Sequence, residues 1–494
     1  MESGDTTWHR NLREVLERAG FTDTNVLARL RVRDFPSLRG GDVPILLHRT
    51  GGGSALDTLI RLFLVEVPCD LDALRDAIRP MDIQGLAGAG LITIEGSSAR
   101  PAVKLLPYKN LFIAFDLPSR LLGDGRQDYV MGIGSSTLTL AGLTIRKPSR
   151  LTLDLGTGCG FHALLAAHHS DRVIATDINE RAVRFTRFNA MTNGIEHIEC
   201  RTGDLFKPVQ GHAFDLIVTN PPFVISPERA YIYRDSGLDA DDLCRTIVRE
   251  APRYLADGGF CQILCNWAEY AGSDWNAGLE SWFAGTGCDA WVMRSECRDI
   301  ATYASTWIRH TEKGDAVNYP ERFGEWLRYY DHLGISHIGA GVITMRKRSA
   351  SRNWFRADEA PDSMLGPCGD GIANGFLLQD FLDGATDRDL LGARLTLSPD
   401  ARLERSCSPS PEGWMETALK LRLARGLAYS GDIDPFMAGV LTLCSGQRSL
   451  GEVLQDLAAA LDSSPDTIQD AFIGIIRALV GQGFLLPEGC RFEQ

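Results

Sequence analysis

The stretch that decides the fold begins with Leu153-Asp154-Leu155-Gly156-Thr157-Gly158-Cys159-Gly160. An apolar run that breaks into alternating glycines predicts a buried strand, a tight turn and a helix, because glycine lets the backbone bend sharply and approach a ligand closely. About twenty residues further on, a second apolar run at 173–176 ends in Asp177, where a carboxylate can accept hydrogen bonds from two ribose hydroxyls. The spacing Gly-x-Gly-x-Gly differs from the Gly-x-Gly-x-x-Gly of nicotinamide-dinucleotide sites, which disfavours that alternative.

Strand and helix patterns then alternate up to a second motif. Residues 180–189 predict a helix, 197–200 a third strand that is followed by Gly203-Asp204, and 214–219 a fourth strand. This alternation predicts an α/β fold with a parallel sheet. The fourth strand ends in Asn220-Pro221-Pro222-Phe223, at the carboxyl edge where open α/β sheets bind their ligands.

The second motif suits a planar amino group, whose delocalised lone pair makes it a poor nucleophile until it is held in place. The Asn220 side-chain oxygen and the Pro221 carbonyl can accept its two N–H hydrogens. Pro221 and Pro222 fix the backbone and remove competing donors. Phe223 can stack on the flat face of the group.

These residues together resemble the class I S-adenosylmethionine-dependent methyltransferases, in the branch that methylates nitrogen with an Asn-Pro-Pro-aromatic motif. That branch includes release-factor glutamine, ribosomal RNA guanine and DNA adenine methyltransferases. The resemblance implies a Rossmann-like core, S-adenosylmethionine as the cofactor and no metal ion. It assigns the methionine end of the cofactor to Asp154, Gly156, Gly158 and Gly160, the ribose to Asp177 and the adenine amino group to Asp204. Further cofactor contacts are Thr157, Ile178, Leu205 and Asn220. The residues that would hold the target nitrogen are Asn220, Pro221, Pro222 and Phe223.

The segments on either side of these motifs extend the resemblance. Residues 233–239 are similar to the Gly-Leu-Asp stretch of glutamine methyltransferases, whereas phenylalanine at 223 is commoner in ribosomal RNA and small-molecule relatives. Tyr129 and Thr137 are candidate contacts over the methionine moiety. We assign no general base, and interpret the acids that follow the motif as solvated loop acids: Glu228, Asp235 and Asp239.

The chain of 494 residues is too long for the core alone, so we predict a three-part protein. The parts are a mainly helical domain at 1–122, the methyltransferase domain at 123–350 and a further domain at 351–494. Residues 86–92 and 479–485 share a Gly-x-Gly turn after helical segments, which indicates a winged-helix plan in each flank. An aromatic insertion at about 298–336 is a candidate substrate lid; packing against a flanking domain is the alternative.

The composition indicates which class of methyl acceptor and which cellular location to expect. With 51 basic against 64 acidic residues, the net charge is -13, so a nucleic-acid partner is less favoured than a protein or small molecule. The twelve cysteines lack the spacing of metal ligands, so we interpret them as reduced core residues. No run reaches the roughly eighteen apolar residues of a membrane span, and residues 1–5 do not resemble a signal peptide, so we expect a cytoplasmic protein.

The sequence therefore predicts an N-methyltransferase that acts on an amide, amine or amino-heterocycle nitrogen of a protein glutamine or a small metabolite. A ribosomal RNA or DNA base is the alternative acceptor. A cofactor-binding scaffold without enzyme activity is the remaining reading, and it would leave the Asn-Pro-Pro-Phe motif without a use. The oligomeric state stays open.

Overall fold

The computed structural model describes residues 5–35, 42–122, 127–228, 234–235, 237–311, 318–350, 352–361, 364–411 and 413–488. The chain divides into two compact units. The first contains Met1–Ala141 and Pro148–Asp358, and the second contains Gly142–Lys147 and Glu359–Gln494. The predicted N-terminal and central parts thus lie in one unit, and the predicted boundaries near 122 and 350 stay a proposal.

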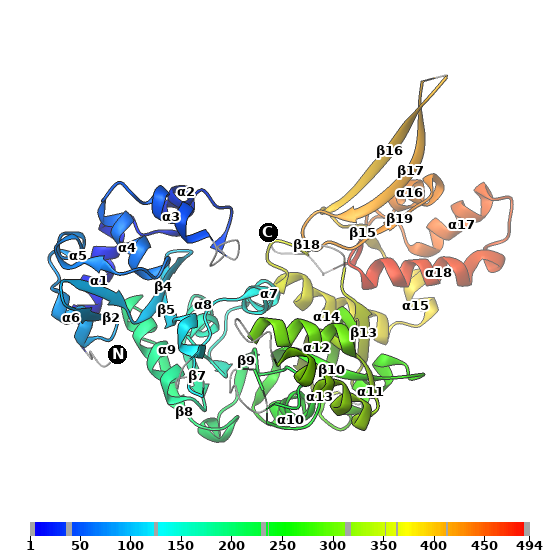
Figure 1. Ribbon diagram of the computed structural model, residues 1–494. Coiled ribbons are helices and arrows are strands. Elements are labelled where there is room, and N and C mark those ends of the chain that lie inside the picture. Colours follow the sequence, from blue (N-terminus) through cyan, green and yellow to red (C-terminus); the bar gives the residue numbers. More distant parts are fainter. Residues whose placement is uncertain are drawn as a thin grey trace. The chain divides into compact units, whose positions relative to one another are not determined.

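The centre of the first unit is an eight-stranded sheet in the order β13-β11-β12-β10-β9-β6-β7-β8 (Figure 1). Strands β8, β7, β6, β9 and β10 run parallel, as the sequence predicted, while β12 runs antiparallel to both β10 and β11. The predicted α/β class is confirmed. The strands are β6 (Thr152–Leu155), β7 (Val173–Asp177), β8 (Ile198–Thr202), β9 (Phe214–Thr219), β10 (Leu255–Tyr270), β11 (Cys288–Asp299), β12 (Ile335–Lys347) and β13 (Phe355–Glu359).

The central parallel strands β6, β7 and β9 are mainly buried because helices cover the sheet. All residues of β6 are buried, as expected for a strand with both faces covered. Helix α9 buries Ala182, Val183 and Phe185 among other residues, and its N-cap Asn179 accepts from the backbone N–H of Arg181. The helices of this core are α7 (Ser135–Leu143), α8 (Phe161–Ala166), α9 (Glu180–Thr192), α10 (Asp242–Glu250), α11 (Trp275–Phe283), α12 (Ile300–Thr311) and α13 (Tyr319–Leu333).

The N-terminal part of this unit combines helices with a small sheet of order β1-β3-β2. Helices α5 and α6 precede a β2–β3 hairpin, and this order supports a winged-helix plan, which stays a proposal. The elements are α1 (Thr6–Arg18), α2 (Asp23–Leu30), α3 (Val43–Arg49), α4 (Ala55–Phe63), β1 (Cys69–Asp70), α5 (Leu71–Ile78), α6 (Ile83–Gly88), β2 (Ile92–Glu95), β3 (Ser98–Pro101), β4 (Val103–Tyr108) and β5 (Leu111–Asp116).

Strand β5 joins this part to the core by packing against α9. The Asn189 amide accepts from the backbone N–H of Ala114 at 2.8 Å and donates to its carbonyl at 2.9 Å, as a neighbouring strand would. Asn193 does the same for the N–H and carbonyl of Phe112. One hydrophobic cluster runs from the N-terminal helices to Phe185 and Phe188 of α9. The two predicted domains therefore share a core.

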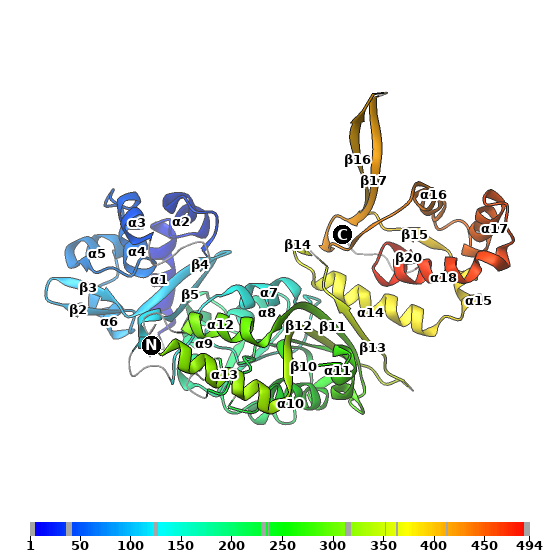
Figure 2. The same ribbon diagram turned by 45° about the vertical axis from the view of Figure 1, so that its right-hand side comes forward.

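The second unit contains a helical core and a long hairpin. Figure 2 shows β16 (Ala401–Ser410) and β17 (Gly413–Leu423) extending away from the rest of this unit. Helices α17 (Leu450–Ala460) and α18 (Pro465–Gly481) precede β20 (Leu485–Pro487), which pairs with β15 (Leu395–Leu397). The winged-helix interpretation of this end stays a proposal. Its other elements are β14 (Met364–Leu365), α14 (Gly369–Gly384), α15 (Asp387–Gly392), β18 (Gly426–Leu427), β19 (Ser430–Asp432) and α16 (Pro435–Leu443).

Across the described ranges of both units, no helix is both long and apolar enough to cross a membrane.

Candidate functional site

A cavity of about 410 Å³ opens at the carboxyl ends of β6, β7 and β9. This is the edge at which the sequence placed the site. Most of the predicted site residues line the cavity: Gly156, Thr157, Gly158, Asp177, Ile178, Asp204, Leu205, Asn220, Pro221 and Pro222. Tyr129 and Thr137, the candidate contacts from the upstream loop, line it as well.

The glycine loop leaves room for a ligand. Gly156 and Gly158 have φ angles of 72° and 56°, which residues with a Cβ rarely adopt. A Cβ added at either position would meet nothing within 4 Å, so the backbone here faces open space. Gly160 differs, since a Cβ there would lie 2.8 Å from the Thr186 side chain of α9. Gly160 is absent from the cavity wall, and the structure gives it a role in packing α8 against α9.

Asp154 also lies behind the loop instead of in the cavity wall, which corrects its predicted place at the methionine end. Its Oδ2 accepts from Thr157 Oγ1 at 2.6 Å and from the backbone N–H of Ala163 at 2.9 Å. Burial raises the pKa of Asp154 to about 7, against the opposing effect of these two hydrogen bonds. Asp154 thus fixes the loop that faces the cavity.

The raised pKa of Asp154 gives a stability prediction. The unfolded pKa is about 3.9, so between about pH 4 and pH 7 the folded state binds more protons than the unfolded state, and stability falls as pH rises. Asp154→Asn keeps an acceptor oxygen but does not titrate. We expect the melting temperature of the wild type to fall relative to that of the variant across this window, measured by thermal unfolding without cofactor. Parallel melting curves would contradict the raised pKa.

Asp177 at the end of β7 and Asp204 just after β8 both line the cavity, as the sequence predicted. Asp177 accepts from the backbone N–H of Gly158 through Oδ2 and from that of Asn179 through Oδ1, both at 2.9 Å. These bonds hold its carboxylate between the glycine loop and α9. Asp204 accepts from Lys207 Nζ at 2.8 Å, and Leu205 has a φ of 45°, a strained value that often marks a ligand site.

The first three residues of the Asn-Pro-Pro-Phe motif line the cavity, and the fourth does not. Thr219 Oγ1 donates to the carbonyl of Leu155 at 2.8 Å, which ties the end of β9 to the end of β6. Asn220 Oδ1 is buried, and no donor for it lies in the described parts of the chain. Phe223 is not in the cavity wall but packs, partly buried, against two hydrophobic clusters. Its stacking on the acceptor stays a prediction.

Two of the acids after the motif are not solvated, which corrects a prediction. Asp235 is buried, lines the cavity and accepts from Arg234 Nε at 2.7 Å. Glu228 accepts from Arg234 Nη2 at 2.6 Å, and its side chain is only 16% exposed. Asp239 is exposed, as predicted. Tyr233 and Ser236 of the Gly-Leu-Asp stretch lie outside the described residues.

A buried carboxylate of β5, which the sequence gave no reason to single out, holds the upstream loop at the cavity. Asp116 is fully buried and accepts from Arg181 of α9 through both oxygens. Its Oδ2 also accepts from the backbone N–H of Val130 at 2.8 Å. Val130 lines the cavity next to Tyr129 and Met131. The N-terminal part therefore contributes directly to the shape of the site.

We expect Asp116→Asn to lower the free energy of unfolding by about 2 kcal/mol, because the charged hydrogen bonds to Arg181 are lost in a buried place. Cofactor affinity should fall with it, since the Val130 segment loses its anchor. Urea titration and cofactor-binding titration measure the two effects. Asp76→Asn is the matched control, because Asp76 pairs with Arg79 on the surface, where both side chains are 72% exposed. Equal behaviour of the two variants would contradict the assigned role.

The parallel sheet, the open glycine loop and the acids at the next two strand ends define a class I methyltransferase core. Residues 132–273 match the family model of the methyltransferase small domain. Residues 18–102 match a domain of unknown function, DUF7059, and residues 373–487 match another, DUF7782.

Curated proteins similar to this chain include three methyltransferases with different named substrates. The chain is 38% identical over 140 residues to ribosomal protein uL3 glutamine methyltransferase of Bradyrhizobium diazoefficiens, which covers 25% of this chain and 44% of that protein. It is 34% identical over 137 residues to release factor glutamine methyltransferase of Xylella fastidiosa, covering 25% and 49%. It is 33% identical over 135 residues to ribosomal RNA small subunit methyltransferase C of Alcanivorax borkumensis, covering 27% and 38%. The chain spans less than half the length of each.

Proposed function

We propose that this protein is an enzyme that transfers a methyl group from S-adenosylmethionine to a nitrogen, with the amide of a protein glutamine or of a small metabolite as the favoured acceptor. The observation that carries the proposal is Asn220, which lines the cavity with a buried Oδ1 that lacks a donor among the described residues. Such an acceptor favours a ligand that brings an N–H group.

The residues at the cavity suit the proposed cofactor. Gly156 and Gly158 offer backbone next to open space for the methionine end, Asp177 the ribose contact and Asp204 the adenine contact. When bound, S-adenosylmethionine would supply an electrophilic methyl group on its sulfonium. Asp154 and Gly160 would act indirectly, by fixing the loop and the start of α8.

The chain's own contribution to the reaction would be positioning. The Asn220 oxygen and the Pro221 carbonyl would accept the two N–H hydrogens of the target and point its nitrogen at the methyl group. Pro221 and Pro222 hold those acceptors because their rings restrict the backbone. Holding both reactants in line is the main source of rate in such a displacement.

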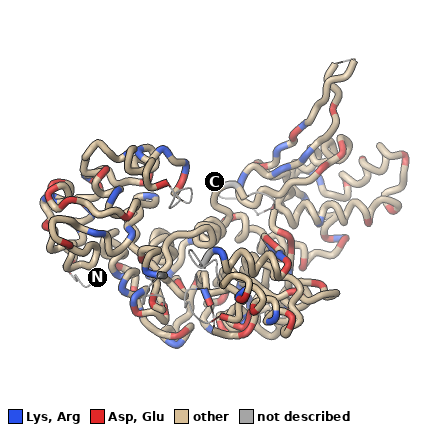
Figure 3. The backbone as a smooth tube through the Cα atoms, viewed as in Figure 1, with Lys and Arg blue, Asp and Glu red and all other residues tan. Residues whose placement is uncertain are grey.

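The alternative acceptor is a base of ribosomal RNA or DNA, which the ribosomal RNA methyltransferase among the relatives supports. Charge argues against it. The net charge is -13, and Figure 3 shows Lys and Arg interspersed with Asp and Glu. The uL3 and release-factor relatives act, by their names, on glutamine. Since these acceptors belong to the translation apparatus, we also propose a cytoplasmic location.

Transfer of labelled methyl from S-adenosylmethionine into a bacterial extract tests the proposal. The extract is divided into a nuclease-treated part, a protease-treated part and a small-molecule filtrate, and label is counted in each. We expect label that survives nuclease and appears in protein or filtrate. Label that disappears with nuclease would favour the nucleic-acid alternative. Absence of label from every fraction would contradict the proposed methyltransferase activity.

A further inference from the structure

The α12–α13 insertion packs on the segment that follows the Asn-Pro-Pro-Phe motif. The two helices lie side by side, and their aromatic side chains form one cluster with Val224 and Ile225. Tyr303 Oη accepts from the backbone N–H of Ile225 at 3.2 Å, and Tyr330 Oη donates to the carbonyl of Ile225 at 2.8 Å. Both polar groups of one peptide segment are therefore held by the insertion.

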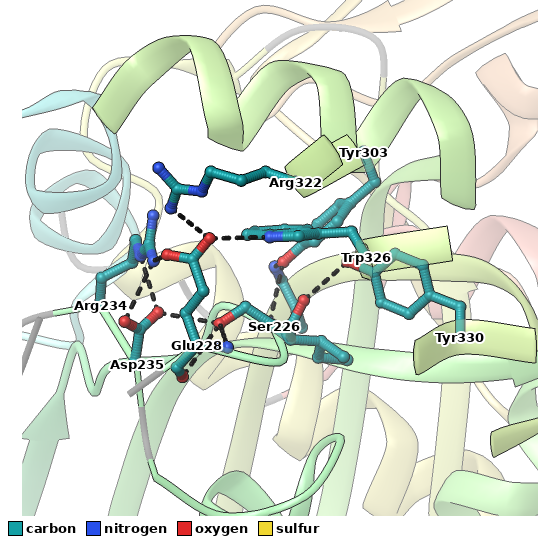
Figure 4. A network of polar contacts seen from close by, with 10 residues as sticks. Ser226, Glu228, Arg234, Asp235, Tyr303, Arg322, Trp326 and Tyr330 are labelled. Carbon is teal, nitrogen blue, oxygen red and sulfur yellow. Dashed lines mark hydrogen bonds and ion pairs between the residues drawn. The ribbon is translucent and has the colours of Figure 1, made fainter. Parts of the chain in front are cut away.

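A charged network continues from this contact to the cavity (Figure 4). Glu228 Oε1 accepts from Trp326 Nε1 at 2.9 Å and from Arg322, both on α13. Its Oε2 accepts from Arg234 Nη2 at 2.6 Å. Glu228 thus connects the α12–α13 insertion to the segment that follows the Asn-Pro-Pro-Phe motif.

Arg234 carries the connection to Asp235. Its side chain is 1% exposed, and it donates to Asp235 Oδ1 at 2.7 Å through Nε and to Oδ2 at 3.0 Å through Nη2. Ser226 Oγ donates to the same Oδ1 at 3.0 Å. The backbone N–H of Val224 donates to the Arg234 carbonyl at 3.2 Å, so this pair is fixed beside the motif.

Burial makes the geometry of this network exacting. A buried arginine between two carboxylates is stable only when its partners stay in place, because an unpaired buried charge is costly. Planar, bidentate pairing of the guanidinium with Asp235 also leaves that carboxylate little rotational freedom. Asp235 lines the same cavity as Asn220, so displacement of Glu228 would be felt at the acceptor end.

We propose that Glu228 is a positioning residue for the methyl acceptor, which links the α12–α13 insertion through Arg234 to Asp235 at the cavity. This inference rests on the proposed function. It assigns the insertion to acceptor binding and gives Asp235 a part in acceptor specificity. We expect cofactor binding to be independent of the network, because the glycine loop follows β6 and Asp177 ends β7.

The test compares Glu228→Gln and Arg322→Gln with Arg328→Gln in the full chain. Arg328 is an exposed residue of the same helix as Arg322 and serves as the matched control. The rate of methyl transfer is measured against increasing concentrations of nuclease-treated, dialysed bacterial protein, and S-adenosylmethionine affinity is measured by titration calorimetry. We expect the apparent KM for the protein fraction to rise about tenfold in the first two variants, with kcat within about threefold.

Cofactor affinity should match the wild type in all of them. The apparent KM of the double variant Glu228→Gln/Arg322→Gln should be no higher than that of the more impaired single variant, because both changes remove the contact between Glu228 and Arg322. An unchanged apparent KM, or parallel losses of kcat and cofactor affinity as in a general loss of structure, would overturn the proposal.

Hydrogen exchange gives a readout that does not depend on activity. The Ile225 amide, which donates to Tyr303, should exchange faster in Glu228→Gln and Arg322→Gln than in Arg328→Gln. If the wild type methylates neither this protein fraction nor the small-molecule filtrate, the proposed function fails, and exchange still decides whether Glu228 positions the segment. If the wild type is active and exchange at Ile225 is unchanged in both variants, the positioning role fails while the proposed function stands.

Discussion

Asn220→Ala is expected to reduce kcat for methyl transfer by about 100-fold or more while S-adenosylmethionine affinity stays within about twofold, as when a preorganised hydrogen-bond partner of a reacting group is removed. The variant loses the side-chain oxygen proposed to accept one hydrogen of the target amino group. The other acceptor, the Pro221 carbonyl, belongs to the backbone and stays. The target nitrogen then remains more planar and less well aimed, which raises the barrier at the displacement.

The measurement is single-turnover methyl transfer with saturating cofactor, together with a binding titration for S-adenosylmethionine. Gln210→Ala removes an exposed amide from the same domain and should leave both quantities unchanged. Full methylation by an Asn220→Ala variant that binds cofactor normally would remove the role assigned to this side chain. A loss of cofactor affinity equal to the loss of rate would show that Asn220 acts only as the cofactor contact also predicted from the sequence, and not on the methyl acceptor.

Asp177→Ala is expected to weaken S-adenosylmethionine binding by about 100-fold, which is the effect of losing hydrogen bonds to a charged acceptor. The carboxylate already accepts from Gly158 and Asn179, so it is fixed before the ribose arrives. The variant loses the proposed ribose contact and the contact that holds Gly158. Once cofactor is saturating, the rate of methyl transfer should recover most of its wild-type value.

Calorimetric titration measures the affinity, and the rate is followed over a wide range of cofactor concentration. Asp171→Ala is the control, because Asp171 is an exposed acid that precedes the same strand, β7, at its far end. Asp177→Asn keeps the size of the side chain and should fall between the wild type and the alanine variant. Unchanged affinity in Asp177→Ala would show that the ribose is bound elsewhere.

Both predictions concern residues that the sequence identified, and the reason is geometric. Gly156, Gly158, Asp177 and Asn220 each follow an apolar run that forms a parallel strand, and parallel strands end at one edge of the sheet. Consecutive residues and a single packing rule were enough to bring them to one cavity.

The sequence was less informative about which way individual side chains point. Asp154 and Phe223 belong to the same motifs, yet Asp154 lies behind the loop and Phe223 packs into the core. Motif position fixes where the backbone is, and not whether a side chain faces the ligand or the interior. That choice depends on the volume left by neighbouring helices, which local patterns do not contain.

By itself, then, the sequence determined the α/β class, the edge of the sheet at which the cavity opens and twelve of the 28 residues in the cavity wall. Only the tertiary structure decided the pairings between distant polar and charged groups. Asp116 meets Arg181 across 65 positions, and Glu228 meets Trp326 across 98. In the sequence each looks like an ordinary polar residue, because burial and partner are properties of the packed chain. Those pairings fix the two segments between which the proposed substrates would lie.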